Sequence, residues 1–220
     1  IFISNGAWAD LFTVALKIDG KFSSIVVEKG TPGFEIGKEE KKMGMEGSST
    51  VPLYFTDCKV PVENLLGKPG EGAGPAFCAL NIGRFKLGAS AIGGMVLGMK
   101  HATDYAKERK AFGQNISDFG AIQDKLATSA ILTYTLESTC YAVIGNQTDA
   151  ISELDKEDPK YYVKQGDITE RYIAENSIVK VYGSEAAEEL IDHCFQVYGG
   201  YGFIEAVSYT HLTLPTTVQV

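Results

Sequence analysis

One arginine stands in an otherwise apolar stretch of the chain. Arg84 closes the run Asn81-Ile82-Gly83-Arg84, near the start of a long helical pattern. An unpaired guanidinium costs free energy when it leaves water for apolar surroundings. Arg84 is therefore predicted to have an anionic partner.

A second arginine ends the same helical pattern, in the run Glu108-Arg109-Lys110-Ala111-Phe112-Gly113. Cations at a helix C-terminus complement the macrodipole, and a glycine just beyond the last turn commonly ends a helix. On spacing alone we favour this structural role, with Gly113 at the position after the cap, over a functional one.

Two glycine-rich stretches could lie against a ligand. The run from Gln196 to Phe203 ends the last helical pattern with glycines that would let a ligand approach the backbone, although a glycine-rich helix stop is favoured on physical grounds. The glycines between Gly67 and Pro75 lack the strand-turn-helix frame and the downstream acid of a phosphate loop, so a flexible linker is favoured there.

Metal and nucleophile chemistry find no support. The three histidines lie near no G-x-S-x-G elbow and no H-E-x-x-H or H-x-E motif, and the four cysteines form no C-x-x-C pair. We expect no metal site, ordinary histidines and four buried, reduced thiols.

The first part of the chain is written in short β-type runs. Residues 11–18 and 22–27 flank Asp19-Gly20, which is a type I′ turn signal, and residues 51–55 form a further run. We predict a small antiparallel β domain over residues 1–66, ending at the composition break that begins at Gly67.

Helical periodicity begins after Pro75, and we predict a C-terminal four-helix bundle domain over residues 67–206. Turn signals at Gly113, Gly145 and Gly183 separate the predicted helices 76–110, 121–143, 169–181 and 185–197. The fold class is therefore α+β, with a β domain followed by a four-helix bundle. Small residues in the first helix indicate close helix packing, and residues 149–160 are predicted to be a solvated loop.

Composition excludes several classes of protein. Hydrophobic residues at 45% and charged residues at 22% are typical of a globular chain rather than a disordered one. A net charge of -8 argues against a nucleic-acid surface, and the uncharged stretch 87–99 is too short to span a membrane. The chain begins at Ile1 rather than Met, so we expect a fragment without its true N-terminus.

Several motifs, taken in order, resemble the acyl-CoA dehydrogenase family. They are Phe2-Ile3-Ser4-Asn5-Gly6, Lys42-Met43-Gly44, Val60-Pro61, Asn81-Ile82-Gly83-Arg84, Glu108 to Gly113, Ile122 to Ala127 and Gln196 to Gly200. Together they span residues 1 to about 205. The Asn-x-Gly-Arg form and the segment 183–187 resemble most the very-long-chain branch and its bacterial relatives.

The resemblance implies a fold and an assembly. An N-terminal helical domain, absent here, would precede a middle β domain and a C-terminal four-helix bundle. FAD would lie between the two last domains and a neighbouring subunit of a homodimer or homotetramer. We expect a bacterial cytoplasmic location, with the mitochondrial matrix as the alternative.

The resemblance also implies site residues. It places Phe2, Ile3 and Ser4 along the flavin, and the Ser4 hydroxyl would be able to hydrogen-bond the flavin. Arg109 would meet the FAD pyrophosphate, and Phe112, three residues further on, would also contact the cofactor. The backbone near the cofactor would come from a second subunit, at Gln196, Val197, Tyr198, Gly199 and Gly200. The acyl-CoA site would be lined by Asn81, Ile82, Gly83 and Arg84.

The implied reaction is α,β-dehydrogenation of an acyl-CoA thioester, with electrons passing to an electron-transferring flavoprotein. The family's catalytic glutamate lies either directly before the helix arginine or in a loop beyond the Gly-Gly run. Gly83 occupies the first position and the second motif is absent, so no catalytic base is assigned. The fragment is expected to be inactive alone.

Two other functions stay open. An acyl-CoA oxidase or flavin monooxygenase of the same superfamily would keep the fold and change the oxidant, and a non-catalytic scaffold would keep only the fold. Residues 207–220 do not match the family and are predicted to be a foreign tail, so His211 is given no role.

Overall fold

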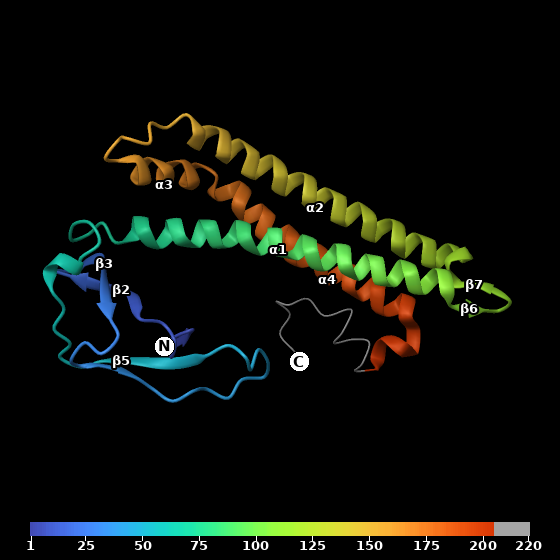
Figure 1. Ribbon diagram of the computed structural model, residues 1–220, viewed down its shortest axis with the longest axis horizontal. Coiled ribbons are helices and arrows are strands. Elements are labelled where there is room, and N and C mark those ends of the chain that lie inside the picture. Colours follow the sequence, from blue (N-terminus) through green and yellow to red (C-terminus); the bar gives the residue numbers. More distant parts are fainter. Residues whose placement is uncertain (205–220) are drawn as a thin grey trace. The chain divides into compact units, whose positions relative to one another are not determined.

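The computed structural model describes residues 1–204, apart from the side chain of Pro75 (Figure 1). The described chain divides into two compact units, residues 1–77 and 78–204. The first is built from strands and the second from helices. The expected α+β class, a small antiparallel β region followed by four helices, is confirmed.

The β unit contains two small antiparallel sheets. β1 (Phe2–Ser4), β5 (Thr50–Phe55) and β4 (Phe34–Ile36) form one sheet in the order β1-β5-β4. The other is the hairpin of β2 (Leu11–Ile18) and β3 (Lys21–Glu28).

The predicted type I′ turn of this hairpin is confirmed. Asp19 and Gly20 both have positive φ, 49° and 76°, which matches the twist of paired strands. A short 3-10 helix follows at Val62–Asn64.

Aromatic side chains form the core of the β unit. Phe12, Val27 and Phe34 are buried. The Phe34 ring packs edge-on against Phe12 and stacks on Phe55, with centroid distances of 4.8 and 4.7 Å. These contacts pack β4 against β5 of its own sheet and against β2 of the hairpin.

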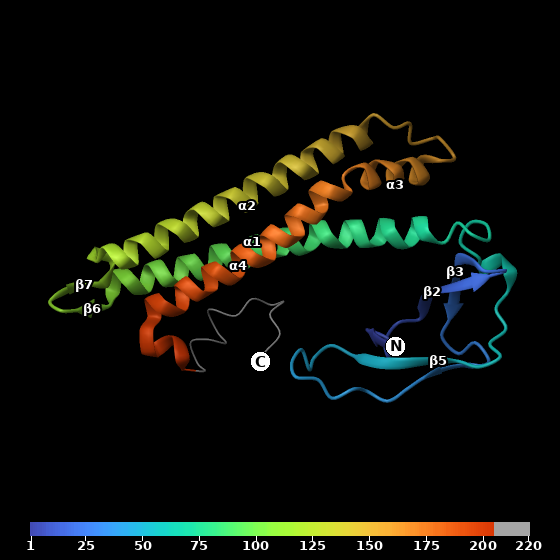
Figure 2. The ribbon, with the colours of Figure 1, turned by 180° about the vertical axis from the view of Figure 1, so that it is seen from behind.

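The helical unit is built from helices that pack around a shared buried core. The helices are α1 (Ala73–Glu108), α2 (Gly120–Ser152), α3 (Tyr161–Arg171) and α4 (Ile173–Tyr198). Both ribbon views show α3 and α4 following one another along the bundle (Figures 1 and 2). The side chains of Met95, Leu136, Val179 and Leu190 are fully buried between α1, α2 and α4.

The predicted close packing of α1 is confirmed at Gly88. A Cβ atom there would lie 2.3 Å from Val179 Cγ1 and 2.7 Å from the Val179 carbonyl oxygen. On the facing helix, a Cβ atom at Gly183 would lie 2.9 Å from the Gly88 Cα. The two glycines let the α1 and α4 backbones approach each other directly.

Two predicted helix boundaries are wrong. Helices at 169–181 and 185–197 were expected, but α4 is continuous through Gly183, because that glycine serves a helix contact and not a turn. The second helix likewise continues through Gly145 to Ser152. The separate helix α3 was missed.

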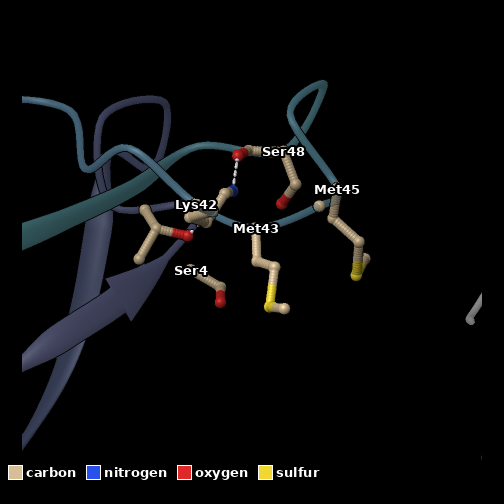
Figure 3. Close-up of a pocket in the computed structure, with 7 residues that line it drawn as sticks. Ser4, Lys42, Met43, Met45 and Ser48 are labelled. Atoms are coloured by element: carbon tan, nitrogen blue, oxygen red, sulfur yellow. Dashed lines mark hydrogen bonds between the residues drawn. The ribbon is translucent and has the colours of Figure 1, made fainter. Parts of the chain in front are cut away.

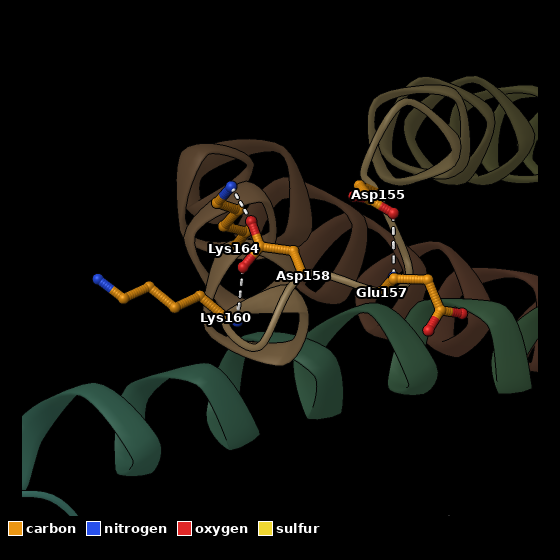
Figure 4. A network of polar contacts seen from close by, with 5 residues as sticks. All are labelled: Asp155, Glu157, Asp158, Lys160 and Lys164. Carbon is orange, nitrogen blue, oxygen red and sulfur yellow. Dashed lines mark hydrogen bonds and ion pairs between the residues drawn. The ribbon is translucent and has the colours of Figure 1, made fainter.

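The connection between α2 and α3 is shorter than the predicted loop and is ordered by polar side chains (Figure 4). Asp155 accepts a hydrogen bond from the Glu157 backbone, and Asp158 accepts one from the Lys160 backbone. Asp158 also pairs with Lys164 on α3. These contacts hold the first turn of α3, although exposed ion pairs add little to stability.

Candidate functional site

Three tyrosines fasten the segment after α4 to the end of α1. Tyr105 stacks on Tyr198 with 4.3 Å between ring centroids, and the Tyr198 hydroxyl donates to the His101 carbonyl over 3.2 Å. Tyr201 lies in the 3-10 helix Gly199–Phe203, with its ring centroid 6.4 Å from that of Tyr105. Stacked and tilted ring pairs at these distances are stabilising.

Arg109 lies beside this tyrosine cluster. Its guanidinium carbon is 5.7 Å from the centroid of the Tyr201 ring, within the range of a cation–π contact. Its backbone is held on both sides, because its N–H donates to Tyr105 O and its carbonyl accepts from Ile116 N. None of the acidic side chains in residues 1–204 lies within ion-pairing distance of this exposed guanidinium.

The expected helix cap at Gly113 is wrong. α1 ends at Glu108, and a hairpin of β6 (Lys110–Ala111) and β7 (Gln114–Asn115) follows. Phe112 and Gly113 form its turn, with φ of 51° and 88°. Two successive residues of positive φ define a two-residue hairpin turn, so the glycine serves the hairpin. Phe112 is 96% exposed and meets the edge of the Phe119 ring.

The five residues predicted to lie near a cofactor from Gln196 onward separate into two groups. Val197 and Tyr198 are buried in the helical core, so their side chains position the segment. Gln196, Gly199 and Gly200 are exposed. α4 ends before Gly199, whose φ of 57° is the left-handed conformation that glycine adopts without strain.

A second candidate region lies in the β unit, around Ser4. A pocket of about 250 Å³ is lined by Ser4, Lys42, Met43, Gly44, Met45, Ser48 and Thr50 (Figure 3). The Lys42 ammonium donates to the Ser48 carbonyl and to the Thr50 hydroxyl. Ser4 pairs with Thr50 in the β1–β5 register, so this lysine fixes the strand end opposite Ser4.

The side chains next to Ser4 differ in exposure. Phe2 is 71% exposed and presents a flat apolar face, whereas Ile3 is half-buried. The pocket combines hydroxyl groups with two methionine side chains. Phe2, whose ring is exposed, stands two residues before Ser4 in the sequence.

Arg84 is held by a neutral neighbour. Its Nη1 donates to Asn81 Oδ1 over 2.8 Å, and the Asn81 side chain is buried with its Nδ2 unpaired among the described residues. The described part of the chain supplies no carboxylate within ion-pairing distance of Arg84, so its predicted anionic partner stays a prediction. A Cβ atom at Gly83 would meet nothing within 4 Å, so a side chain fits there.

Burial favours the protonated form of two of the four cysteine thiols. Burial raises the pKa of the Cys194 thiol to about 11 and raises that of Cys140 above its ordinary value. Cys58 and Cys78 are only half-buried, which corrects the expectation of four buried thiols. In residues 1–204 no group of three or more potential ligands could hold a metal ion, and no helix has the length and hydropathy needed to cross a bilayer.

Sequence reasoning missed the residues that support the site. Tyr105 stands four positions before Arg109, in the last turn of α1, and this spacing is a usable signal that the two residues lie close together. Tyr201 and Lys42 stand in runs that the sequence singles out, but their partners could not be predicted, because the contacts span a long sequence separation or lie within an irregular loop.

Comparisons with known proteins cover nearly the whole chain. Residues 1–58 match the model of the acyl-CoA dehydrogenase middle domain, and residues 70–217 match that of the acyl-CoA dehydrogenase C-terminal domain. A probable acyl-CoA dehydrogenase of Bacillus subtilis is 42% identical over 205 residues, which is 93% of this chain and 34% of that protein.

A second relative and a solved structure agree. The very long-chain specific acyl-CoA dehydrogenase of Rattus norvegicus is 38% identical over 215 residues, covering 93% of this chain and 30% of that protein. A crystal structure of an acyl-CoA dehydrogenase complexed with FAD from Bacillus anthracis is 42% identical, with a TM-score of 0.86 over 93% of this chain and 35% of that one. The chain spans about a third of the length of these relatives.

Proposed function

Because the chain belongs to the acyl-CoA dehydrogenase family, we propose that it forms the FAD-binding and substrate-binding parts of an enzyme that oxidises acyl-CoA thioesters at the α and β carbons. The observation that carries the proposal is at the end of the helical bundle. There an exposed arginine, which makes no ion pair with the acids of residues 1–204, lies beside the glycine-rich segment after α4. That pairing suits an anionic ligand.

The residues present fit FAD. Arg109 would meet the pyrophosphate, because a planar guanidinium matches phosphate oxygens. Gly199 and Gly200 leave their backbone open to a close approach, and in the β unit Ser4 would hydrogen-bond the ring system while Phe2 covers an apolar face. The bound cofactor would supply the two-electron oxidising group.

Substrate binding is assigned to the start of α1. Arg84 keeps donors beyond the one given to Asn81, so it would meet an anionic or carbonyl oxygen of the acyl-CoA. The half-buried position of Arg84 keeps it partly shielded from water, which strengthens such a contact.

The base that removes the α proton is not assigned to any residue of this sequence. Gly83 has no side chain that accepts a proton, although the space around it would admit one. A positioned base is worth ~10²–10⁴ in rate, so we expect the 220-residue chain to show no turnover by itself.

The test uses FAD affinity, which does not depend on turnover. Arg109→Ala should raise the Kd of FAD for the full chain roughly tenfold or more, since a hydrogen bond to a charged group is worth ~1.5–3 kcal/mol. The matched control is Lys107→Ala, which removes a cation from the last turn of α1. If Arg109→Ala lowers only the melting temperature and leaves the Kd of FAD unchanged, Arg109 serves the helix end and the assignment is wrong.

The electron acceptor is proposed to be an electron-transferring flavoprotein. Oxygen is the acceptor in the oxidase and monooxygenase alternatives. Slow reoxidation of the reduced flavoprotein by air would support a dehydrogenase, and rapid reoxidation would support an oxidase or a monooxygenase.

A further inference from the structure

The exposed guanidinium of Arg109 needs something to hold it if it is to bind an anion tightly. A free arginine side chain loses rotamer entropy when it is fixed on a ligand. A side chain held in place before binding avoids part of that loss. The Tyr201 ring lies within cation–π range of the guanidinium, with 5.7 Å between the guanidinium carbon and the ring centroid.

The Tyr201 residue is 50% exposed, but its backbone is anchored and one side of its ring lies against Tyr105. Gly202, the next residue, is buried, and a Cβ atom there would lie 3.0 Å from the Phe195 carbonyl oxygen. The Tyr201 carbonyl accepts a hydrogen bond from Ile204 N, and the ring tilts against Tyr105. Because Tyr105 stacks on Tyr198, the ring is braced by residues of α1 and α4 together.

An aromatic ring suits this purpose better than a carboxylate. A carboxylate would hold Arg109 by occupying its N–H donors and by cancelling its charge. A ring face attracts the cation through its quadrupole and leaves the in-plane donors available. The described acids make no ion pair with Arg109, so its charge remains available to a ligand.

We propose that Tyr201 is a positioning residue, whose ring holds the Arg109 guanidinium ready to bind the diphosphate group of a dinucleotide. This inference rests on the proposed function. Because Tyr201 connects the end of α1 to the segment that follows α4, Arg109 and the Gly199–Gly200 segment of the same subunit would approach one cofactor together, whichever subunit supplies the rest of its site.

The experiment is a double-mutant cycle on the Kd of FAD in the full chain. Tyr201→Leu removes the ring and Tyr201→Phe keeps it. A cation–π contact of ~0.5–1 kcal/mol corresponds to a two- to fivefold weaker affinity for Tyr201→Leu. Tyr201→Phe should bind FAD as the unchanged chain does. In an Arg109→Ala background, Tyr201→Leu should cause no further loss.

A second readout needs no cofactor. The side-chain protons of Arg109 should show ring-current shifts in the NMR spectrum of the unchanged chain and of Tyr201→Phe, and Tyr201→Leu should abolish them. Titration with inorganic pyrophosphate should then perturb the Arg109 resonances at lower concentration in the unchanged chain than in Tyr201→Leu.

The outcomes separate the two proposals. If FAD does not bind but the ring-current shifts and the pyrophosphate response are present, the proposed function fails and the role of Tyr201 stands. If Tyr201→Leu weakens FAD by the same factor with and without Arg109, Tyr201 does not act through Arg109 and the inference is wrong. Absence of the ring-current shifts overturns it as well.

Discussion

The contact between α1 and α4 at Gly88 allows a direct test of the packing argument. Gly88→Ala adds one methyl group on a helix, which by propensity alone should stabilise the protein by ~1 kcal/mol. The structure predicts the opposite sign. The added Cβ would lie 2.3 Å from Val179 Cγ1 and 2.7 Å from the Val179 carbonyl oxygen.

The magnitude follows from which atoms can move. The Val179 side chain can change rotamer only at a cost, because it is fully buried. Its carbonyl oxygen is part of the α4 backbone, so α1 and α4 must separate to restore an ordinary contact of 3.4–4 Å. Overpacking of this kind costs ~1–3 kcal/mol, and the separation also weakens contacts around Met95 and Leu136. After the ~1 kcal/mol gained by propensity is subtracted, we expect Gly88→Ala to destabilise the helical unit by up to ~2 kcal/mol net.

The assay is thermal and urea unfolding of matched variants. Gly93→Ala is the control, because Gly93 lies on the same helix, is exposed and would place a Cβ atom with nothing within 4 Å. Gly93→Ala should raise the melting temperature, whereas Gly88→Ala should lower it by ~2–4 °C per kcal/mol. Equal stabilisation by both substitutions would show that α1 and α4 do not meet at Gly88.

Three further results are expected. Burial raises the pKa of the Cys194 thiol to about 11, so the folded state binds more protons than the unfolded state at high pH. The free energy of unfolding should therefore fall by up to ~2–3 kcal/mol as pH rises from ~9 to 11. Urea unfolding at several pH values should show a weaker pH dependence of stability in Cys194→Ala. Lys42→Met should lower the stability of the β unit by ~1.5–3 kcal/mol, as measured by urea unfolding, because it removes bonds from a charged donor, while Lys38→Met should have little effect. Arg84→Gln should reduce turnover with acyl-CoA in an active enzyme far more than its flavin content, and lost flavin with normal turnover would move Arg84 to the cofactor side.

Short sequence signals predicted the fold correctly where the structure depends on residues that are close together in the chain. Asp19-Gly20 specified its hairpin because a type I′ turn needs two residues of positive φ, and the turn was found at that place. The turn predicted at Gly183 was wrong, because the missing side chain there makes room for α1. A glycine that serves a turn and one that serves a contact look the same in a sequence, because the difference lies in a neighbour far along the chain.

The candidate site was predictable only in part. The resemblance named Arg109 and Gly199, and the structure places both at the same end of the helical bundle. It could not name Tyr201 as the partner of Arg109, since a cation–π contact depends on where a ring arrives after the chain turns at Gly199. The hairpin at Phe112-Gly113 was missed for a related reason, because its strands are only two residues long and show no alternation.

The cationic residues of the candidate sites differ in how they use their hydrogen-bond donors. Lys42 gives its ammonium donors to the Ser48 carbonyl and the Thr50 hydroxyl, so it shapes the Ser4 pocket from its wall. Arg84 gives one donor to a neighbouring amide, and its other donors have no hydrogen-bond partner in residues 1–204. Arg109 is held by a ring, which takes none of its donors. A cation whose position is fixed while its donors stay available is the one best suited to an anionic ligand, and this makes Arg109 the residue on which the proposed function most directly depends.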